Sequence, residues 1–225
     1  MSSTLSNESV FATHAEMLSA NELAERARRG IPRWADVSIA LLVLIIASPL
    51  IAVLAVLIAL TSGMPVFFRQ QRVGVGFRPF SMVKLRTMSA TQIGPKVTRK
   101  DDPRITRLGR FLRQTKLDEL PTFWNVLRGD IALVGPRPEV PEYVNENDPL
   151  WQAVLTVRPG LTDPVTISLR NEEELLARVE SDPHTFYVNE LQPAKLKGYV
   201  DYLQKRTLRS DIRVLGRTVT AIIGA

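Results

Sequence analysis

Residues 37–60 read VSIALLVLIIASPLIAVLAVLIAL, an uncharged apolar run with a Ser48-Pro49 pair near its centre. A continuous helix of this length would be about 36 Å long, enough to cross the hydrocarbon core of a bilayer. Proline removes one helical hydrogen bond and favours a kink, and the Ser48 hydroxyl can bond back to a nearby carbonyl. The run therefore predicts a membrane segment over residues 32–63 that either spans once or turns at this pair.

Basic residues lie on both sides of the run, and they are Arg26, Arg28, Arg29 and Arg33 before it and Arg69, Arg72, Arg78, Lys84 and Arg86 after it. A segment that spans once would leave one group outside the cytoplasm, against the positive-inside tendency. A re-entrant helix, broken at Ser48 and Pro49, keeps both groups and both termini on the cytoplasmic side. The charge pattern favours the re-entrant form, although kinked spanning helices keep the alternative open.

The chain has 225 residues, a net charge of +6 and no cysteine. This length suits one catalytic domain plus a membrane segment, and the positive charge favours anionic partners such as phosphates and acidic lipids. The absence of cysteine excludes disulfides and thiolate metal sites. His14 and His184 stand alone, which argues against a histidine metal site or a Ser-His pair.

The sequence patterns divide the chain into an N-terminal extension (1–31), the membrane segment (32–63) and one remaining domain (64–225). An amphipathic helix is predicted over 15–29, a β-hairpin over 66–72 and 80–87, and a loop over 89–103. Helical patterns follow from residue 104, over 118–127, and after Asn171, which resembles an N-cap. Residues 193–223 are basic and amphipathic, and could lie in a membrane interface or pack on the core. The fold class predicted is α+β, mostly helical.

The stretch Lys116-Leu-Asp118-Glu119-Leu-Pro121 carries the most distinctive chemistry. Proline is tolerated in the first turn of a helix, so Asp118 and Glu119 are expected at or just before a helix start. Adjacent carboxylates facing arginines offer a nucleophile and a metal ligand for phosphoryl transfer. An acidic pair at a helix start is more commonly a simple cap, and the basic surroundings are what favour the catalytic interpretation.

The sequence supplies several cations for binding phosphates: Lys84, Arg86, Arg110, Arg113 and Arg137. Arginine suits bidentate phosphate contacts, and Arg137 lies in Gly135-Pro136-Arg137-Pro138, a turn stiffened by two prolines. The alternative for the basic residues as a group is a surface placed against anionic lipid headgroups.

Together these motifs resemble the bacterial sugar transferase family, monotopic phosphoglycosyl transferases that act on polyprenyl phosphate. The matching segments are Ser48-Pro49, FRQQRVG from Phe68, KLRTM from Lys84, RITRLGRFLRQTKLDELPTFWNVLRGDIALVGPRPE over 104–139, and RPGLT from Arg158. The resemblance extends from residue 32 to about residue 225, and the central block is its most specific part.

The resemblance implies an enzyme on the cytoplasmic face of the bacterial inner membrane, held by a re-entrant helix. A UDP-sugar would donate its sugar phosphate to undecaprenyl phosphate, with UMP released, as the first membrane step of polysaccharide or glycoprotein glycan synthesis. Asp118 would form a covalent phosphosugar intermediate, Glu119 would help hold Mg²⁺, and Arg137 would contact the nucleotide-sugar. Lys84, Arg86, Arg110 and Arg113 would contact phosphates. Nucleic acid is not expected as a partner, and a homodimer is left open.

One departure concerns residues 163–177, DPVTISLRNEEELLA, where relatives often carry a Gly-x-Ala-Gln-Val-type segment and an Asn-rich loop. This difference leaves the donor sugar unassigned. Two other functions remain open: a membrane glycosyltransferase that releases UDP, and a non-catalytic, membrane-anchored module that binds anions. The second would explain the charge and the apolar run but not the paired carboxylates or the GPRP turn.

Overall fold

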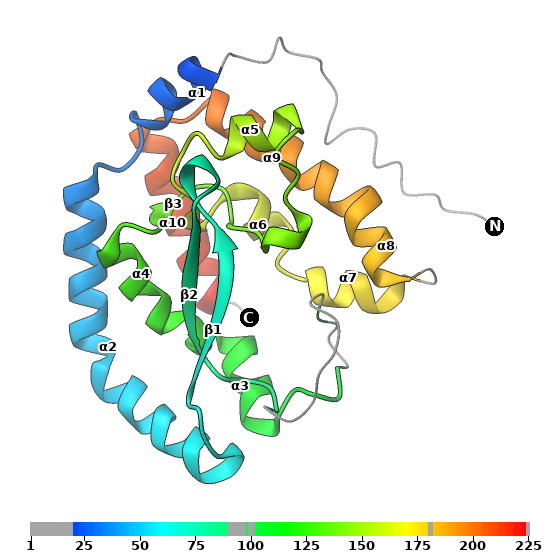
Figure 1. Ribbon diagram of the computed structural model, residues 1–225. Coiled ribbons are helices and arrows are strands. Elements are labelled where there is room, and N and C mark those ends of the chain that lie inside the picture. The colour runs from blue at the N-terminus through cyan, green and yellow to red at the C-terminus, as the bar shows by residue number, and fades with distance from the viewer. Residues whose placement is uncertain (1–19, 90–97, 99–101, 180–181, 224–225) are drawn as a thin grey trace.

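The computed structural model describes residues 20–89, 98, 102–179 and 182–223 (Figure 1). Its main helices are α1 (Ala20–Ala27), α2 (Arg33–Ser62), α3 (Arg107–Thr115), α4 (Phe123–Arg128), α5 (Pro149–Val154), α6 (Pro164–Ser168), α7 (Glu172–Arg178), α8 (Pro183–Phe186), α9 (Gln192–Gln204) and α10 (Leu208–Ile223). The strands are β1 (Phe67–Val73), β2 (Pro79–Leu85), β3 (Ala132–Val134) and β4 (Gly160–Thr162). The prediction of a mostly helical α+β fold is confirmed.

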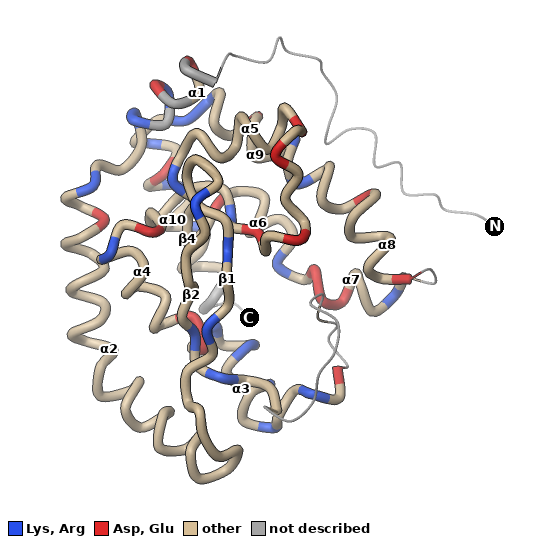
Figure 2. The backbone as a smooth tube through the Cα atoms, viewed as in Figure 1, with Lys and Arg blue, Asp and Glu red and all other residues tan. Residues whose placement is uncertain are grey.

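Helix α2 is continuous from Arg33 to Ser62 and contains Pro49 within it. In Figure 1 it curves along one side of the molecule, and in Figure 2 its middle carries no charged residue. The Ser48 hydroxyl donates to the carbonyl of Ile45 at 2.9 Å, the local back-bond expected beside a proline. The predicted break is therefore a bend within one helix, because proline removes only one backbone hydrogen bond.

Most of α2 has no protein packed against it. Only 11% of its most apolar 18-residue stretch is buried against other parts of the protein. Ile46 and Leu60 are 70% and 79% exposed. Among the residues that the structure describes, α2 is the one helix long and apolar enough to cross a membrane. A core helix of a water-soluble domain would instead bury such a surface.

The N-terminal end of α2 is attached to the rest of the domain by polar contacts. An Arg33 guanidinium nitrogen donates to the carbonyl of Leu127, near the carboxyl end of α4, at 2.8 Å. The buried Asp36 carboxylate accepts the backbone N–H of Leu133, in β3, at 3.1 Å. These contacts fix the first turn of α2 against α4 and β3.

The C-terminal end of α2 is attached to the same domain. Arg86, just after β2, donates one guanidinium nitrogen to the carbonyls of Ser62 and Gly63 at 2.6 and 2.5 Å. Below this contact, Leu54 and Ile58 of α2 pack in a buried cluster with the hairpin and α3. Both ends of the apolar helix are thus held by one folded body.

The predicted hairpin is confirmed, with β1 and β2 antiparallel and Phe68 opposite Lys84. Its turn contains Gly76 at φ 62°, a backbone conformation that favours glycine. Asn125 of α4 accepts the N–H of Val83 at 3.0 Å and donates to the carbonyl of Ser81 at 2.7 Å. The outer edge of β2 is therefore closed by a side chain that holds the hairpin on α4.

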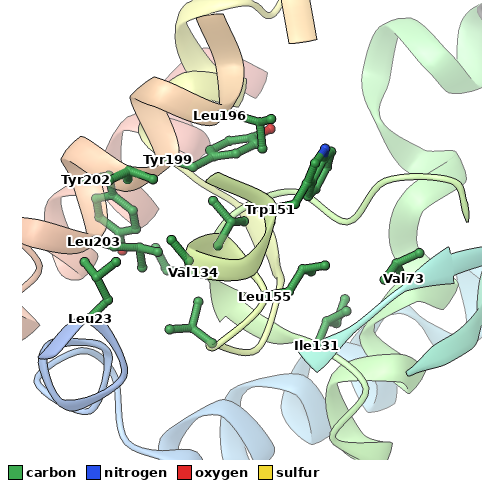
Figure 3. Packing of buried hydrophobic residues seen from close by; sticks show 14 of the residues in the cluster. Leu23, Val73, Ile131, Val134, Trp151, Leu155, Leu196, Tyr199, Tyr202 and Leu203 are labelled. Atoms are coloured by element: carbon green, nitrogen blue, oxygen red, sulfur yellow. The ribbon is translucent and has the colours of Figure 1, made fainter. Parts of the chain in front are cut away.

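The main core lies around β3 and β4, a short parallel pair that the sequence analysis did not predict. Figure 3 shows Trp151, Tyr199 and Leu203 among the side chains that fill it, from α5 and α9. Leu23 of α1 is fully buried in the same cluster, so the described part of the N-terminal extension packs on the main core.

The C-terminal amphipathic stretch forms two helices with different environments. Most of the apolar side chains of α9 are buried in the core, whereas α10 leaves Ile212 59% exposed and Val219 55% exposed. Between the two helices, buried Arg206 pairs with Asp211 at 2.8 Å and donates to the carbonyl of Val134 at 2.7 Å. This pair fixes the start of α10 against β3.

Side-chain caps begin several of the helices. Thr106 caps α3 by accepting the N–H of Gly109 at 2.9 Å, and Asp163 caps α6 by accepting the N–H of Val165 at 2.7 Å. Asn171 occupies the predicted N-cap position of α7, but its side chain makes no capping hydrogen bond. The first turn of α7 carries Glu172, Glu173 and Glu174, as predicted.

Gly109 allows α3 to approach the end of the hairpin closely. A Cβ at this position would lie 1.9 Å from the carbonyl oxygen of Thr87. We therefore expect Gly109→Ala to lower the free energy of unfolding by about 3 kcal/mol, because the backbone must shift to relieve the clash. Thermal unfolding followed by circular dichroism in detergent measures the change.

Gly216→Ala in α10 is the matched control, since no atom lies within 4 Å of a Cβ placed there. Replacing a glycine inside a helix by alanine should stabilise the protein by roughly 0.5–1 kcal/mol. Equal unfolding temperatures for the two variants would contradict the close packing of α3 on Thr87.

Candidate active site

The acidic pair lies where α3 turns sharply into the short helix η3 (Leu117–Thr122). Lys116 joins them with φ 58°, a left-handed conformation that is uncommon outside glycine. The N–H of Glu119 donates to the Lys116 carbonyl at 3.2 Å. The single helix predicted over 118–127 is wrong, because a 3₁₀ segment containing Pro121 precedes α4. This turn places Asp118 and Glu119 beside the hairpin.

Glu119 brings together two of the predicted phosphate-binding cations. Its Oε1 atom accepts hydrogen bonds from Lys84 at 2.8 Å and from Arg137 at 2.6 Å. Burial opposes ionisation, but Arg137 and Lys84 outweigh it and hold the pKa of Glu119 well below its usual range. Burial lowers the pKa of Lys84, and the Glu119 carboxylate opposes that shift. At neutral pH the cluster is a carboxylate shared by two cations.

Asp118 differs from its neighbour. It is 7% exposed, and its Oδ1 atom is buried without a hydrogen-bond partner among the described residues. Burial, with the nearby Glu119 carboxylate second, raises the pKa of Asp118 to about 6. At pH 7 this group is therefore mostly ionised but poorly solvated, and a carboxylate with those properties is a strong nucleophile.

The other predicted cations lie around this cluster without touching the acidic pair. Arg86 holds the carboxyl end of α2, and its Nε and Nη1 atoms are buried without a partner in the part of the chain that the structure describes. Arg113 contacts Thr87 at 3.4 Å and forms an ion pair with Glu173 of α7. Arg110 is exposed on α3. These three arginines border the same groove as Asp118.

A second charged network lies next to Arg137, and the sequence analysis did not single it out. Glu139 accepts a hydrogen bond from Arg72 at 3.2 Å and one from the Tyr187 hydroxyl. Lys195 lies 3.3 Å from the same hydroxyl and 3.2 Å from a carboxylate oxygen of Glu172. Arg72 and Glu139 lie in the quoted motifs FRQQRVG and GPRPE, whereas their partners in α7, α9 and the segment before α9 are distant in sequence.

These groups border an open groove with a volume of about 3120 Å³. It runs past the hairpin, η3 and α3, and extends to α7 and α9 on one side and to α2 and α10 on the other. In Figure 2 basic residues gather along the hairpin and α3. The groove is large enough for two substrates, and its most densely charged part surrounds Glu119.

The residues present fit a metal that is held mainly by substrate phosphates. The described residues contain no group of three metal-ligating side chains, as a cage made by protein alone would need. Both cations bind Oε1 of Glu119, and the carboxylate has a second oxygen for a further ligand. Mg²⁺ is commonly bound by one or two carboxylates together with phosphates and water, so this sparse donor set is sufficient.

Comparisons with known proteins show which family the chain belongs to. A family model described as "Bacterial sugar transferase" matches residues 27–225. The UDP-glucose:undecaprenyl-phosphate glucose-1-phosphate transferase of Caulobacter vibrioides is 37% identical over 197 residues, which cover 85% of this chain and 69% of the relative. The exopolysaccharide production protein ExoY of Sinorhizobium fredii is 33% identical over 204 residues, covering 83% of each chain.

A third relative has a longer chain, and its name contains a different sugar. The UDP-N-acetylgalactosamine-undecaprenyl-phosphate N-acetylgalactosaminephosphotransferase of Aeromonas hydrophila is 42% identical over 201 residues, covering 86% of this chain and 44% of the relative. The matched region includes the hairpin, the acidic pair and the Arg137 turn in one continuous family match. The chain therefore belongs to the bacterial sugar transferase family and is a transferase enzyme.

Proposed function

We propose that the enzyme transfers a sugar-1-phosphate from a UDP-sugar to undecaprenyl phosphate and releases UMP. The relatives' names supply the class of donor and acceptor. The observation that carries the proposal is the buried, unpartnered Oδ1 of Asp118 beside a carboxylate that is shared by Lys84 and Arg137. Since the relatives' names differ in the sugar, the donor sugar is left unassigned.

In the first half-reaction, Oδ1 of Asp118 attacks the β-phosphorus of the UDP-sugar. The bond from that phosphorus to the oxygen bridging the two phosphates breaks, and UMP leaves with that oxygen. Asp118 is left joined to the sugar phosphate as an acyl phosphate. Lys84 and Arg137 are placed to offset the charge on the transferring group.

In the second half-reaction, a phosphate oxygen of undecaprenyl phosphate attacks the same phosphorus. The bond to Asp118 breaks, which restores the carboxylate and yields an undecaprenyl-diphosphate sugar. Each step is a displacement at phosphorus that needs no external acid. Using one nucleophile in turn allows a soluble donor and a lipid acceptor to share one site.

Glu119 would hold Mg²⁺ through the carboxylate oxygen that does not bind Lys84 or Arg137. Bound there, Mg²⁺ would neutralise charge on the donor diphosphate and on the leaving UMP. Lys84 and Arg137 keep Glu119 ionised, which is the state that a metal ligand requires.

We also propose that α2 enters the bilayer and returns to the same face, so that both termini lie in the cytoplasm of a bacterium. Two observations support this placement of α2 in the bilayer. Both ends of α2 contact one folded body, and its middle is apolar and exposed. A straight spanning anchor would carry its ends to opposite sides of the membrane. Arginines on α3 and α10 would then face anionic lipid headgroups.

Product analysis tests the reaction. Purified enzyme in detergent, given a panel of UDP-sugars, undecaprenyl phosphate and Mg²⁺, is expected to release UMP, and chelation of Mg²⁺ should stop the release. Release of UDP would instead support a glycosyltransferase that leaves the phosphate behind. Salt-dependent lipid binding without nucleotide consumption would support a non-catalytic anion-binding module.

A further inference from the structure

Residues of α2, β3, β4 and α10 border the groove together with Glu119 and Arg137, and we call this part of the groove the branch between α2 and α10. Apolar side chains from six positions border it: Ile39, Val43, Leu120, Leu133, Leu215 and Val219. Two of these side chains, Ile39 and Val219, are 38% and 55% exposed. In this part of the groove, the wall consists mainly of aliphatic groups from α2, η3, β3 and α10.

The polar groups along this branch are already paired. Thr162 and Thr218, which lie opposite one another on β4 and α10, share a hydrogen bond of 2.8 Å between their hydroxyls. Thr218 also bonds the carbonyl of Val214 at 2.9 Å. A polar ligand such as a nucleotide would find no partner here, whereas a hydrocarbon chain needs none.

The inner end of the branch is cationic. One guanidinium nitrogen of Arg137 donates to the carbonyl of Leu161, which borders the groove, at 3.2 Å, and the other binds Glu119. An apolar path therefore ends at the two cations that share Glu119. The opposite side of the groove carries Glu139, Glu172 and Lys195, and that polar side suits a soluble donor.

We propose that the branch between α2 and α10 binds the first isoprene units of the acceptor, with its phosphate at Arg137 and Lys84. This inference rests on the proposed function for the identity of the acceptor. The occupant is set by chemistry at both ends: aliphatic walls match a single hydrocarbon chain, and the cations match a phosphate monoester. Because each displacement is in line with the bond that breaks, the acceptor phosphate would approach the phosphorus opposite Asp118, where UMP has left, while its chain extends into the branch.

Single-cysteine labelling tests occupancy without turnover. The chain has no cysteine, so Leu215→Cys and Ile212→Cys each introduce one thiol on the same helix. Leu215 borders the branch, whereas Ile212 is 59% exposed and does not border the groove. In phosphatidylglycerol vesicles, saturating undecaprenyl phosphate should slow maleimide labelling at Leu215→Cys at least about fivefold and leave Ile212→Cys unchanged.

The lipid used as control distinguishes an acceptor site from a general lipid surface. Dioleoyl phosphatidic acid presents the same phosphate monoester on two acyl chains, and it should protect Leu215→Cys much less. Equal protection by both lipids would overturn the proposal, and so would protection of Ile212→Cys to the same extent. Because no UDP-sugar is present, this result does not depend on whether the proposed reaction occurs.

A kinetic comparison uses Leu215→Trp, which narrows the branch, and Ile212→Trp as its surface control. Leu215→Trp should raise the KM for undecaprenyl phosphate about tenfold, while the single burst of UMP release from donor alone stays as in the wild type. An unchanged KM in a folded Leu215→Trp protein would refute the branch as the acceptor site. Absence of the burst in the wild type would instead refute the proposed covalent reaction.

Discussion

Asp118→Asn is expected to lower sugar-phosphate transfer by about 10³-fold or more, because an amide cannot form the acyl phosphate. Its side chain keeps the size of the carboxylate, so both substrates should still bind. The measurement is UMP release under single-turnover conditions, together with detection of phosphosugar attached to the protein by mass spectrometry. Normal turnover by this variant would exclude covalent catalysis by Asp118.

The same substitution is expected to stabilise the folded protein at neutral pH. Burial raises the folded-state pKa of Asp118 from 3.8 to about 6. A carboxyl whose pKa is higher in the folded state favours folding when protonated, and this advantage is lost as the pH rises from about 4 to above 6. A shift of this size corresponds to about 2–3 kcal/mol, and asparagine would remove the penalty.

Thermal unfolding at two pH values tests the expected direction of this stability change. At pH 7.5, Asp118→Asn should raise the unfolding temperature by about 5 °C, and at pH 4 the difference should largely vanish. For the wild type, transfer activity should fall as the pH drops below about 6, because the nucleophile becomes protonated. A variant less stable than the wild type at pH 7.5 would show that Asp118 has partners that stabilise its charge.

Glu119→Gln is expected to destabilise the folded protein at neutral pH, whereas Asp118→Asn is expected to stabilise it. Both substitutions replace a carboxylate by the amide of the same size, at adjacent positions. Glutamine would leave Lys84 and Arg137 close together without the carboxylate that they share. Breaking a largely buried ion pair by removing one partner costs about 3 kcal/mol. We therefore expect a lower unfolding temperature at pH 7.5 and a loss of about 10²-fold in transfer, since both cations lose their position.

The control for this variant is Glu190→Gln, at an exposed position outside the site. It should leave unfolding and transfer close to wild type, since isolated surface charges contribute little. If Glu119→Gln were as stable as this control, the shared-carboxylate arrangement would not hold in solution. The two neighbouring carboxylates thus give a paired test of the site: Oδ1 of Asp118 has no hydrogen-bond partner among the described residues, and Glu119 is shared by two cations.

Local patterns in the sequence predicted the elements whose cause is local. Alternating residues and glycines predicted the hairpin, and the apolar run predicted a helical segment over 32–63, which α2 covers without the expected break. The parallel pair of β3 and β4 was missed because each has three residues and exists only through contact with the other. The back-bond of Ser48 was expected from the Ser48-Pro49 pair, but the continuity of α2 through Pro49 was not, because sequence reasoning expected a break there.

The candidate site was predictable in composition but not in arrangement. The sequence singled out Asp118, Glu119, Lys84 and Arg137, and the structure brings the last three into one cluster. The attachment of Arg86 to the end of α2 could not be inferred, because any basic residue near an acidic pair looks like a substrate ligand. Tyr187 escaped notice for a related reason, since its partner Glu139 lies 48 positions earlier in the chain.

The attachment of α2 at both of its ends has a consequence for how the enzyme would meet its lipid substrate. Arg33 and Asp36 fix one end and Arg86 the other, so the helix cannot act as a flexible tether for the catalytic domain. If α2 enters and leaves the bilayer on one face, as proposed, the enzyme would diffuse laterally with the Asp118 carboxylate at a constant height above the bilayer centre. Encounter with the acceptor then becomes a two-dimensional search, in which only rotation and position in the plane remain to be matched.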